Sequence, residues 1–514
     1  MARLKEYNGH YCESEYEYAF IGFLETEGWK YTSGNKLSRV TKRDVLIEDD
    51  FKKFIAVGNP DLTEDEVTQI YDTVRLVGAE SDFATLHKVY NWLVDGIQFT
   101  PKDGIARMIP LINFEKDGVK NIFRVVNQFT VEYTNNGQKE NRRPDVILFV
   151  NGMPLCIMEL KNPADANATI YDAWEQINIR YWRDIPHLLH YCPLACISDG
   201  VKTRLGTVRT PYEHFYAWRR VNDGDAVSTL PFAETETMIK GVYSPERFLE
   251  IFRDYIYFQD SIYDSDEVEI VCRYPQFFAA RLLKKSIVDS VVTKSGRGGT
   301  YFGATGCGKT YTMAFLARQL ALRCTGISEI GSPTIILIVD REELQKQGAK
   351  LFTKSTEFLN LGEVSVVKNR TQLRQELGAR QSGGFYICTI QKFCDREDDK
   401  IGLINDRQNI ICFSDEAHRT QLEHSKKIQF SKDADANMKA MVSKPYAKVL
   451  KEAFPQATFV GFTGTPIAET YQTFGDEIDR YTMDQAVADG LTVSIKYHPR
   501  IAKVLLDNKK VKEI

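Results

Sequence analysis

Apolar and polar positions divide the chain into two blocks with different patterns. In the first block, residues 12–28 repeat large apolar side chains at helical spacing, and strand-like runs lie at 122–126, 129–133, 146–150 and 155–160. The second block, from about 255, alternates helical segments with short apolar runs at 300–302, 334–339, 385–389, 409–413 and 458–462. Strands that are apolar on both faces and alternate with helices predict a parallel sheet covered on each side. We therefore expect an α/β protein.

Polar clusters follow four of the apolar runs in the second block. They are Asp340-Arg341-Glu342, Thr389-Ile390-Gln391, Asp415-Glu416-Ala417-His418 and Thr463-Gly464-Thr465-Pro466. The carboxyl ends of parallel strands meet at one edge of an open sheet, and ligands of such sheets bind at that edge. A ligand site is therefore expected where these clusters gather.

Residues 303–310 read Gly-Ala-Thr-Gly-Cys-Gly-Lys-Thr, a phosphate-loop pattern between a short strand and a helix. The three glycines leave room for phosphates to lie against backbone N–H groups. The lysine would reach the β- and γ-phosphates of a nucleotide, and the final threonine would hold Mg²⁺. The expected nucleotide-binding residues of this loop are Gly303, Thr305, Gly306, Gly308, Lys309 and Thr310. The alternative is a glycine-rich turn without a ligand.

An acidic pair follows the apolar run that ends near residue 414. Asp415 is placed to hold Mg²⁺ at the γ-phosphate, and Glu416 to activate the attacking water as a base. The alternative is a pair of acids that caps a helix. The phosphate loop about 105 residues earlier favours the catalytic interpretation.

A second acidic constellation lies in the first block, as Pro144-Asp145 followed by Glu159-Leu160-Lys161. This is the spacing of a PD-(D/E)xK nuclease, in which two carboxylates hold Mg²⁺ and a lysine positions or deprotonates the attacking water. The pattern is short and also arises by chance. Glu17, close to the buried face of the first helix, is a further acid candidate, with a solvated helix flank as the alternative.

The hairpin that joins the two carboxylates offers a geometric test. With a two-residue loop at 151–152, Asp145 would face Met158, and Glu159 would lie on the opposite side of the sheet. A three-residue loop at 151–153 sets Asp145 across from Glu159, with Lys161 on the same face. We predict this second register, or a bulge of equal effect.

Composition places few further limits on function. The chain of 514 residues is 43% hydrophobic and 26% charged, and its ten cysteines are scattered as expected for reduced core thiols. No apolar run approaches the roughly 18 residues of a membrane span, and the first residues lack a signal-peptide pattern. A cytoplasmic protein without membrane contact is expected. The net charge of −4 argues neither for nor against nucleic acid.

The strings of the second block resemble the first motor lobe of superfamily 2 helicases and translocases of the DEAH type, over about residues 270–495. The resemblance implies a RecA-like parallel sheet that binds ATP and Mg²⁺. It places Gln276 on adenine with Tyr274 near it. It also implies that His418 and the segment from Thr463 to Thr465 couple the ATP state to the grip on nucleic acid.

A PD-(D/E)xK block directly before such a motor resembles the restriction (R) subunit of type I restriction–modification enzymes. Supporting strings include Asn121-Ile122-Phe123, Asn127-Gln128-Phe129, Asn151-Gly152-Met153-Pro154-Leu155 and Val339-Asp340-Arg341. The resemblance implies a mixed-sheet nuclease domain at 1–255, a first motor lobe at 256–495 and a linker at 496–514. It makes Asp145, Glu159 and Lys161 the nuclease residues, joined by an acid of the first helix, for which Glu17 is our choice.

The implied function is ATP-dependent translocation on double-stranded DNA, with double-strand cuts in unmodified DNA away from the recognised site. The implied partners are methyltransferase and specificity subunits. Two alternatives stay open: a DNA-binding motor-type or regulatory protein with an inactive nuclease block, and an RNA-directed helicase.

The sequence departs from the family pattern in two ways. The family commonly carries Gln-x-x-x-Tyr after the active strand, whereas Gln176 and Tyr181 are separated by four residues. Either the helix bulges by one residue, or Tyr181 has another role. In addition, nothing after His498 resembles a second motor lobe with its arginine finger, so we expect this chain alone to lack full ATPase activity.

Overall fold

The computed structural model describes residues 13–78, 80–162, 169–228, 233–259, 267–340, 350–393, 401–417, 428–432, 438–442 and 446–494. Predictions for Arg341, Glu342, His418 and the linker at 496–514 lie outside the described residues. None of the described helices is long and apolar enough to cross a membrane.

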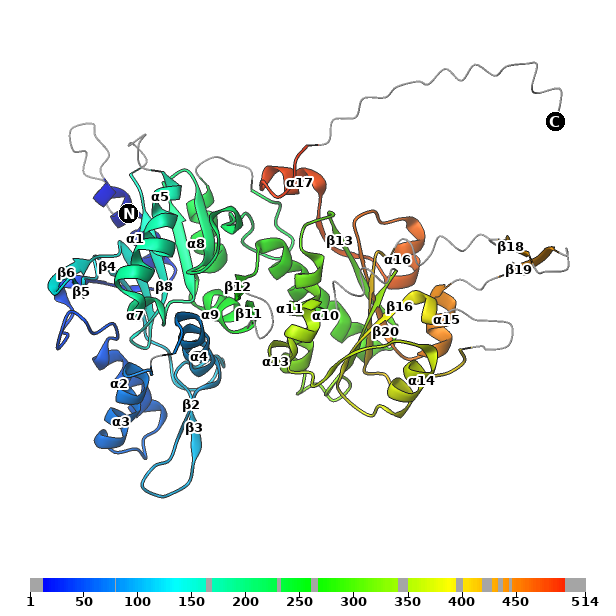
Figure 1. The fold of residues 1–514 in the computed structure, drawn as a ribbon, viewed down its shortest axis with the longest axis horizontal. Helices are drawn as coiled ribbons and strands as arrows, with labels where there is room; N and C mark the ends of the chain where they lie inside the picture. Colours follow the sequence, from blue (N-terminus) through cyan, green and yellow to red (C-terminus); the bar gives the residue numbers. More distant parts are fainter. Residues whose placement is uncertain are drawn as a thin grey trace, which may run out of the picture.

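The first domain is built on a six-stranded mixed sheet, in the order β1-β4-β7-β8-β9-β10 (Figure 1). The pairs β1/β4 and β8/β9 are parallel, and the other three neighbouring pairs are antiparallel. The strands are β1 (Lys30–Ser33), β4 (Phe123–Asn127), β7 (Val146–Val150), β8 (Met153–Leu160), β9 (Leu194–Ser198) and β10 (Thr203–Thr207). β7, β8 and β9 are buried along their whole length, as their uninterrupted apolar sequences require.

Helices and small hairpins surround this sheet (Figure 1). The helices are α1 (Glu13–Thr26), α2 (Glu48–Gly58), α3 (Glu64–Arg75), α4 (Asp82–Asp95), α5 (Ile170–Glu175), α6 (Trp182–Asp184), α7 (Pro186–Leu189), α8 (Glu234–Val242) and α9 (Pro245–Asp254). A π-helix spans Gln176–Tyr181 between α5 and α6. The hairpins pair β2 (Ile97–Phe99) with β3 (Arg107–Ile109), β5 (Val131–Asn135) with β6 (Gln138–Arg142), and β11 (Ile256–Gln259) with β12 (Val268–Val271).

The second domain contains the predicted parallel sheet, with seven strands in the order β15-β16-β14-β17-β20-β13-β21. The strands are β13 (Arg297–Gly303), β14 (Thr334–Val339), β15 (Val364–Val366), β16 (Phe385–Thr389), β17 (Ile410–Asp415), β20 (Thr458–Thr463) and β21 (Glu477–Tyr481). A separate hairpin pairs β18 (Ile428–Lys432) with β19 (Met438–Val442). The helices are α10 (Tyr274–Thr293), α11 (Lys309–Arg323), α13 (Thr356–Leu359), α14 (Arg370–Ala379), α15 (Tyr446–Ala453), α16 (Ala468–Phe474) and α17 (Met483–Ala488).

The alternation of side chains along β14 explains why both faces of this sheet are covered. Ile335, Leu337 and Val339 belong to one hydrophobic cluster, and Ile336 and Ile338 belong to the other. In Figure 1, α10 and α11 lie on one side of the sheet, and α14 and α15 lie on the other. The expected α/β fold, a mixed-sheet domain followed by a RecA-like lobe, is therefore confirmed.

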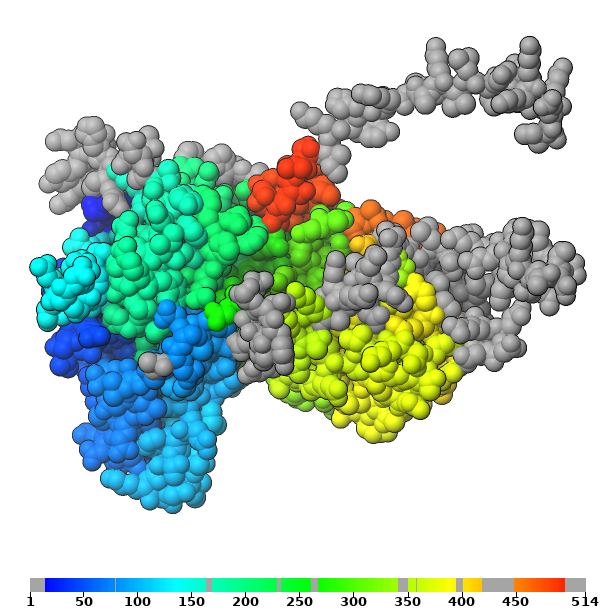
Figure 2. Space-filling view, viewed as in Figure 1, coloured from blue at the N-terminus to red at the C-terminus, as the bar shows by residue number. Residues whose placement is uncertain are grey.

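One apolar cluster continues across the predicted domain boundary at residue 255. The ring of Trp218, from the first domain, lies 5.6 Å from that of Phe277 on α10, and the ring of Tyr255 lies 5.4 Å from that of Phe315 on α11. The two lobes seen side by side in Figure 2 thus share a packed interface. The exact boundary stays a prediction.

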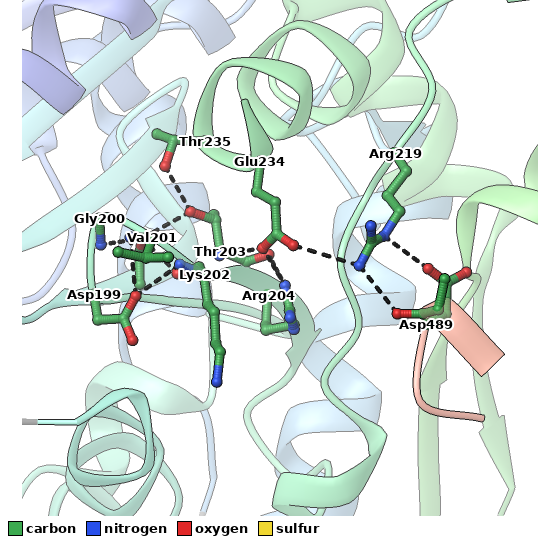
Figure 3. Close-up of polar contacts among 12 residues, drawn as sticks. Asp199, Gly200, Val201, Lys202, Thr203, Arg204, Arg219, Glu234, Thr235 and Asp489 are labelled. Carbon is green, nitrogen blue, oxygen red and sulfur yellow. Dashed lines mark hydrogen bonds and ion pairs between the residues drawn. The ribbon is translucent and has the colours of Figure 1, made fainter. Parts of the chain in front are cut away.

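Arg219 adds a polar link across this interface (Figure 3). Its guanidinium lies 3.5 Å from the carboxylate of Glu234 on α8 and 2.7 Å from that of Asp489, just after α17. Glu234 also pairs with Arg204 and accepts a hydrogen bond from the backbone of Thr203 at the start of β10. A continuous line of polar contacts therefore joins an edge strand of the first sheet to the end of the second domain.

Candidate nuclease and nucleotide-binding sites

The hairpin of β7 and β8 sets the register of the first site. Its loop has two residues, since Val150 pairs with Met153, so the predicted three-residue loop is wrong. β8 instead contains a bulge at Leu155, which lies between the partners of Leu148 and Phe149. The bulge shifts the later pairs by one residue, so that Val146 pairs with Met158. The alternative we allowed, a bulge of equal effect, is confirmed, because continuing this pairing sets Asp145 opposite Glu159.

The two-residue loop follows from its own sequence. Asn151 and Gly152 have φ angles of 52° and 78°, as a hairpin turn of type I′ requires. Asn151 tolerates this conformation, and its side chain accepts a hydrogen bond from the backbone of Ile122 at 2.8 Å. A Cβ atom on Gly152 would lie only 2.2 Å from the carbonyl oxygen of Ile47. The Asn-Gly turn therefore fixes the loop length, and the bulge restores the carboxylate pair.

Asp145 and Glu159 form the acidic centre of this site. Asp145 Oδ2 accepts a hydrogen bond of 2.9 Å from the backbone N–H of Leu160, next to Glu159. Glu159 is fully buried, and both this burial and the neighbouring Asp145 carboxylate raise the pKa of Glu159 well above its usual value. Lys161 Nζ lies 3.7 Å from Glu159 Oε2 and partly offsets this effect. The predicted trio is thus gathered at one place, where a cation would relieve the repulsion between the carboxylates.

The π-helix explains the irregular spacing of Gln176 and Tyr181. A π-turn brings residues five apart into alignment, whereas an α-helix aligns residues three or four apart. Gln176 Nε2 donates to Glu159 Oε2, and the Tyr181 hydroxyl donates to Glu159 Oε1, both at 2.7 Å. Gln176 Oε1 also accepts from Lys161 Nζ at 3.1 Å. Of the two explanations offered by the sequence, the helix bulges by one residue, and both side chains orient the buried carboxylate.

Glu17 of α1 lies near this centre but is held by two amides. It is 4% exposed, and its oxygens accept from Asn127 Nδ2 at 2.6 Å and Gln128 Nε2 at 2.7 Å. The backbone N–H of Gln128 in turn donates to the carbonyl oxygen of Asp145 at 3.0 Å. Within the described part of the chain, no three His, Cys, Asp or Glu side chains are grouped to hold a metal ion. A role for Glu17 at the nuclease site stays a prediction.

The phosphate loop has the backbone that its sequence predicts. Gly306 and Gly308 have φ angles of 80° and 83°, which favour glycine. A Cβ atom on Gly303 would lie 2.6 Å from the ring of Tyr301, and one on Gly308 would lie 2.6 Å from Gln276 Nε2. The loop leaves the end of β13 and enters the N-terminus of α11, where backbone N–H groups are available for an anion.

The acidic pair at the end of β17 faces this loop. Burial and the adjacent Glu416 raise the pKa of Asp415 to about 6, and the Lys309 ammonium acts in the opposite direction. Lys309 Nζ lies 3.9 Å from Glu416 Oε1 and donates to the carbonyl oxygen of Gly303 at 3.3 Å. Glu416 has a φ of 49°, a strained value for a non-glycine residue that is often found at functional sites. Thr310 at the start of α11 is half-buried beside Lys309.

Gln276 lies against the phosphate loop, whereas Tyr274 lies in the domain interface. Gln276 is 2% exposed, accepts from the backbone of Arg273 at 2.9 Å and donates to the carbonyl oxygen of Gly308 at 3.4 Å. The Tyr274 hydroxyl donates to Asp489 at 2.9 Å. Contact of either side chain with adenine stays a prediction, and Gln276 is the better placed.

The Thr463 to Thr465 segment also touches the phosphate loop. The backbone N–H of Thr465 donates to Thr463 Oγ1 at 3.1 Å, and a Cβ atom on Gly464 would lie 3.2 Å from Thr305 Oγ1. Movement of the phosphate loop on nucleotide binding would therefore displace this segment as well. The predicted coupling role stays a prediction.

Arg273 is a residue of this site that the sequence did not suggest. A Cβ atom on Gly308 would lie 2.8 Å from Arg273 Nη2, and Arg273 Nη1 is buried without a hydrogen-bond partner in the described part of the chain. Its guanidinium lies 4.6 Å from the ring centre of Tyr216 in the first domain. The only signal in the sequence is its position at the start of the helix that carries Gln276.

The fold and the two sites define a chain that joins a mixed-sheet domain, with an acidic site of PD-(D/E)xK spacing, to a RecA-like lobe with a phosphate loop. Comparison with protein families agrees. Residues 11–214 match the family "Type I restriction enzyme R protein N terminus", and residues 275–514 match the family "SWI2/SNF2 ATPase".

Relatives cover both regions together. The endonuclease subunit of the type I restriction enzyme HindI of Haemophilus influenzae is 31% identical over 94% of this chain and 46% of its own length. A candidate endonuclease subunit of type I enzyme MjaIXP of Methanocaldococcus jannaschii is 30% identical over 96% of this chain and 46% of its own. The chain belongs to the family of type I restriction enzyme R proteins, and it spans about half the length of these relatives.

Among solved structures, the ATP-dependent Type ISP restriction-modification enzyme LlaBIII bound to DNA is 16% identical, with a TM-score of 0.28 over 45% of this chain and 17% of that chain. The family assignment therefore rests on the sequence matches.

Proposed function

We propose that this chain supplies the nuclease and the first motor lobe of a type I restriction endonuclease subunit. The complete subunit would move along double-stranded DNA at the expense of ATP and would cut both strands of unmodified DNA away from the recognised site. Recognition would belong to separate specificity and methyltransferase subunits, as the resemblance to type I restriction–modification enzymes implies.

The observation that carries this proposal is the convergence on Glu159. Two one-residue irregularities, the bulge in β8 and the π-helix, bring Asp145, Gln176 and Tyr181 to its carboxylate. A degenerate nuclease block would not need to preserve a fully buried carboxylate with two donors, because such a group costs stability. This favours an active nuclease over the alternative of an inactive, regulatory block.

The residues of the nuclease site fit a divalent metal ion. Asp145 and Glu159 would hold Mg²⁺ between them, and the ion would supply Lewis-acid activation of water. Gln176 and Tyr181 would keep the Glu159 carboxylate oriented, as outer hydrogen-bond donors do at metal sites. Lys161, 3.7 Å from Glu159, would position the attacking water or accept its proton.

The second site fits ATP with Mg²⁺. The loop from Gly303 to Thr310 would hold the phosphates, with Lys309 on the β- and γ-phosphates. Thr310 and Asp415 would hold the ion, and Glu416 would act as the base toward water. Energy from this site would drive the movement of the complete subunit along DNA.

The test is the Asp145→Ala variant in the complete subunit, assembled with its partner subunits and assayed for ATP-driven cutting of unmodified DNA. Cutting should be lost while ATP binding remains, because the two sites lie on different sheets. Asp65→Ala, an exposed position on α3, is the matched control and should cut normally. Cutting by Asp145→Ala at the unaltered rate would refute the assignment and would favour another nuclease as the one that cuts.

A further inference from the structure

A cavity of about 620 Å³ lies in the nuclease domain between the hairpin β5–β6 and the helices α6 and α7. The hairpin stands at the outer edge of the domain, away from the motor lobe (Figures 1 and 2). Its lining includes the side chains of Arg43, Arg142, Arg183, Asp184 and His187.

Positive charge dominates the lining of this cavity. Arg142 and Arg183 share the single carboxylate of Asp184, at 2.6 and 2.7 Å. Arg43, which also lines the cavity, is exposed, and no ion pair of its guanidinium is found among the described residues. The nearby Glu140 is occupied by the hydroxyl of Tyr133 and the amide of Asn135. The lining therefore carries three guanidinium groups and one carboxylate, which two of the three already bind.

His187 contributes an unused polar atom. Its Nε2 is buried and has no hydrogen-bond partner among the residues that the structure describes. Burial, with the charges of Arg43 and His190, lowers the pKa of His187 to about 4, so the ring is neutral at pH 7. A buried polar atom without a partner costs free energy unless a ligand or water reaches it.

Two residues of the cavity lie close in the sequence to residues of the nuclease centre. Arg142 precedes Asp145 by three residues, a separation that spans at most about 10 Å. Asp184 follows Tyr181 by three residues, which places it one helical turn away on the same face. Tyr181 itself is bound to Glu159. Arg142, and Asp184 to which Arg142 and Arg183 bind, are therefore close along the chain to residues of the site that would act on the scissile bond.

We propose that this cavity binds a backbone phosphate of the DNA duplex next to the bond that is cut. Arginine is suited to this role, since its planar guanidinium donates two parallel hydrogen bonds to phosphate oxygens. The contact carries no sequence information and would hold any duplex in register with Asp145 and Glu159. This inference rests on the proposed nuclease function.

The test measures binding of a duplex oligonucleotide to the 514-residue chain without divalent metal, across a range of salt concentrations. Arg43→Ala and Arg183→Ala should each weaken binding several-fold and lower the salt slope by about one, equally for unrelated DNA sequences. Arg43→Lys should restore the salt slope, because it keeps the positive charge, but only part of the affinity, because lysine cannot donate two parallel hydrogen bonds to one phosphate. Arg107→Ala, on the β2–β3 hairpin, is the matched control and should bind as the unaltered chain does.

Unchanged affinity and salt slope in both alanine variants would overturn the proposal. A second result would also overturn it: inorganic phosphate binds the unaltered chain but not Arg43→Ala, and the duplex binds both chains equally. The cavity would then bind a free anion and not DNA. The nuclease assignment is tested separately. Intact cutting by Asp145→Ala would remove that assignment whether or not Arg43 contacts DNA.

Discussion

Replacing Tyr181 by Phe removes one hydroxyl from the nuclease site and leaves the aromatic ring in place. That hydroxyl donates to Glu159 Oε1 at 2.7 Å, inside a site where Glu159 is fully buried. Its hydrogen bond favours the charged form of Glu159, against burial and Asp145, which raise the pKa of Glu159. In the variant the pKa of Glu159 should therefore rise further.

The size of the effect follows from the strength of the lost bond. A hydrogen bond to a charged group contributes about 1.5–3 kcal/mol, and loss of an outer partner at a metal site typically lowers metal affinity about 10- to 100-fold. Gln176 still donates to the other oxygen of Glu159 in the variant, so we expect the lower end, about tenfold. Metal binding requires the carboxylate, and the pH of half-maximal binding should rise by about one unit.

The assay is a titration of the 514-residue chain with Mn²⁺ between pH 6 and 9. Tyr171→Phe is the matched control, because Tyr171 is 47% exposed and lies on the neighbouring helix α5. Thermal unfolding of both variants checks that the fold is intact. An unchanged Mn²⁺ affinity and an unchanged pH midpoint in Tyr181→Phe would refute the view that the π-helix serves to hold Glu159.

Three further predictions concern the motor lobe and the interface. Affinity for a nucleotide with Mg²⁺ should fall as the pH drops through about 6, because protonation of Asp415 removes a charge that would hold the ion. Binding of a fluorescent nucleotide would report this affinity. The Asp415→Asn variant should show no such pH dependence. Lys309→Ala should abolish nucleotide binding in the same assay and leave Mn²⁺ binding at the nuclease site unaltered. Arg219→Ala should lower the free energy of unfolding in urea by about 2–4 kcal/mol, because it leaves the buried Asp489 without its cation. A change below about 0.5 kcal/mol would contradict a stabilising role for this polar contact between the two domains.

The second domain was the more predictable from sequence. Its strands are apolar on both faces, so the apolar run itself marks the element: β14 and β16 begin and end where the sequence predicts, at 334–339 and 385–389. The phosphate loop was predictable as well, because its backbone conformation requires glycine at fixed positions. By contrast, Arg219 binds Asp489 in the second domain and Arg273 lies over the ring of Tyr216 in the first, and no local pattern marks these arginines.

The nuclease site shows where sequence spacing stops being informative. Counted along ideal elements, Asp145 and Glu159 fall on opposite faces of a two-residue hairpin, and Gln176 and Tyr181 fall on different faces of an α-helix. One extra residue in β8 and one wider turn in the helix correct both, and the two corrections meet at the same carboxylate. Each irregularity costs stability by itself, because it interrupts a regular ladder of hydrogen bonds. Their coincidence at Glu159 is what a functional requirement on that carboxylate would produce, and packing alone offers no reason for it.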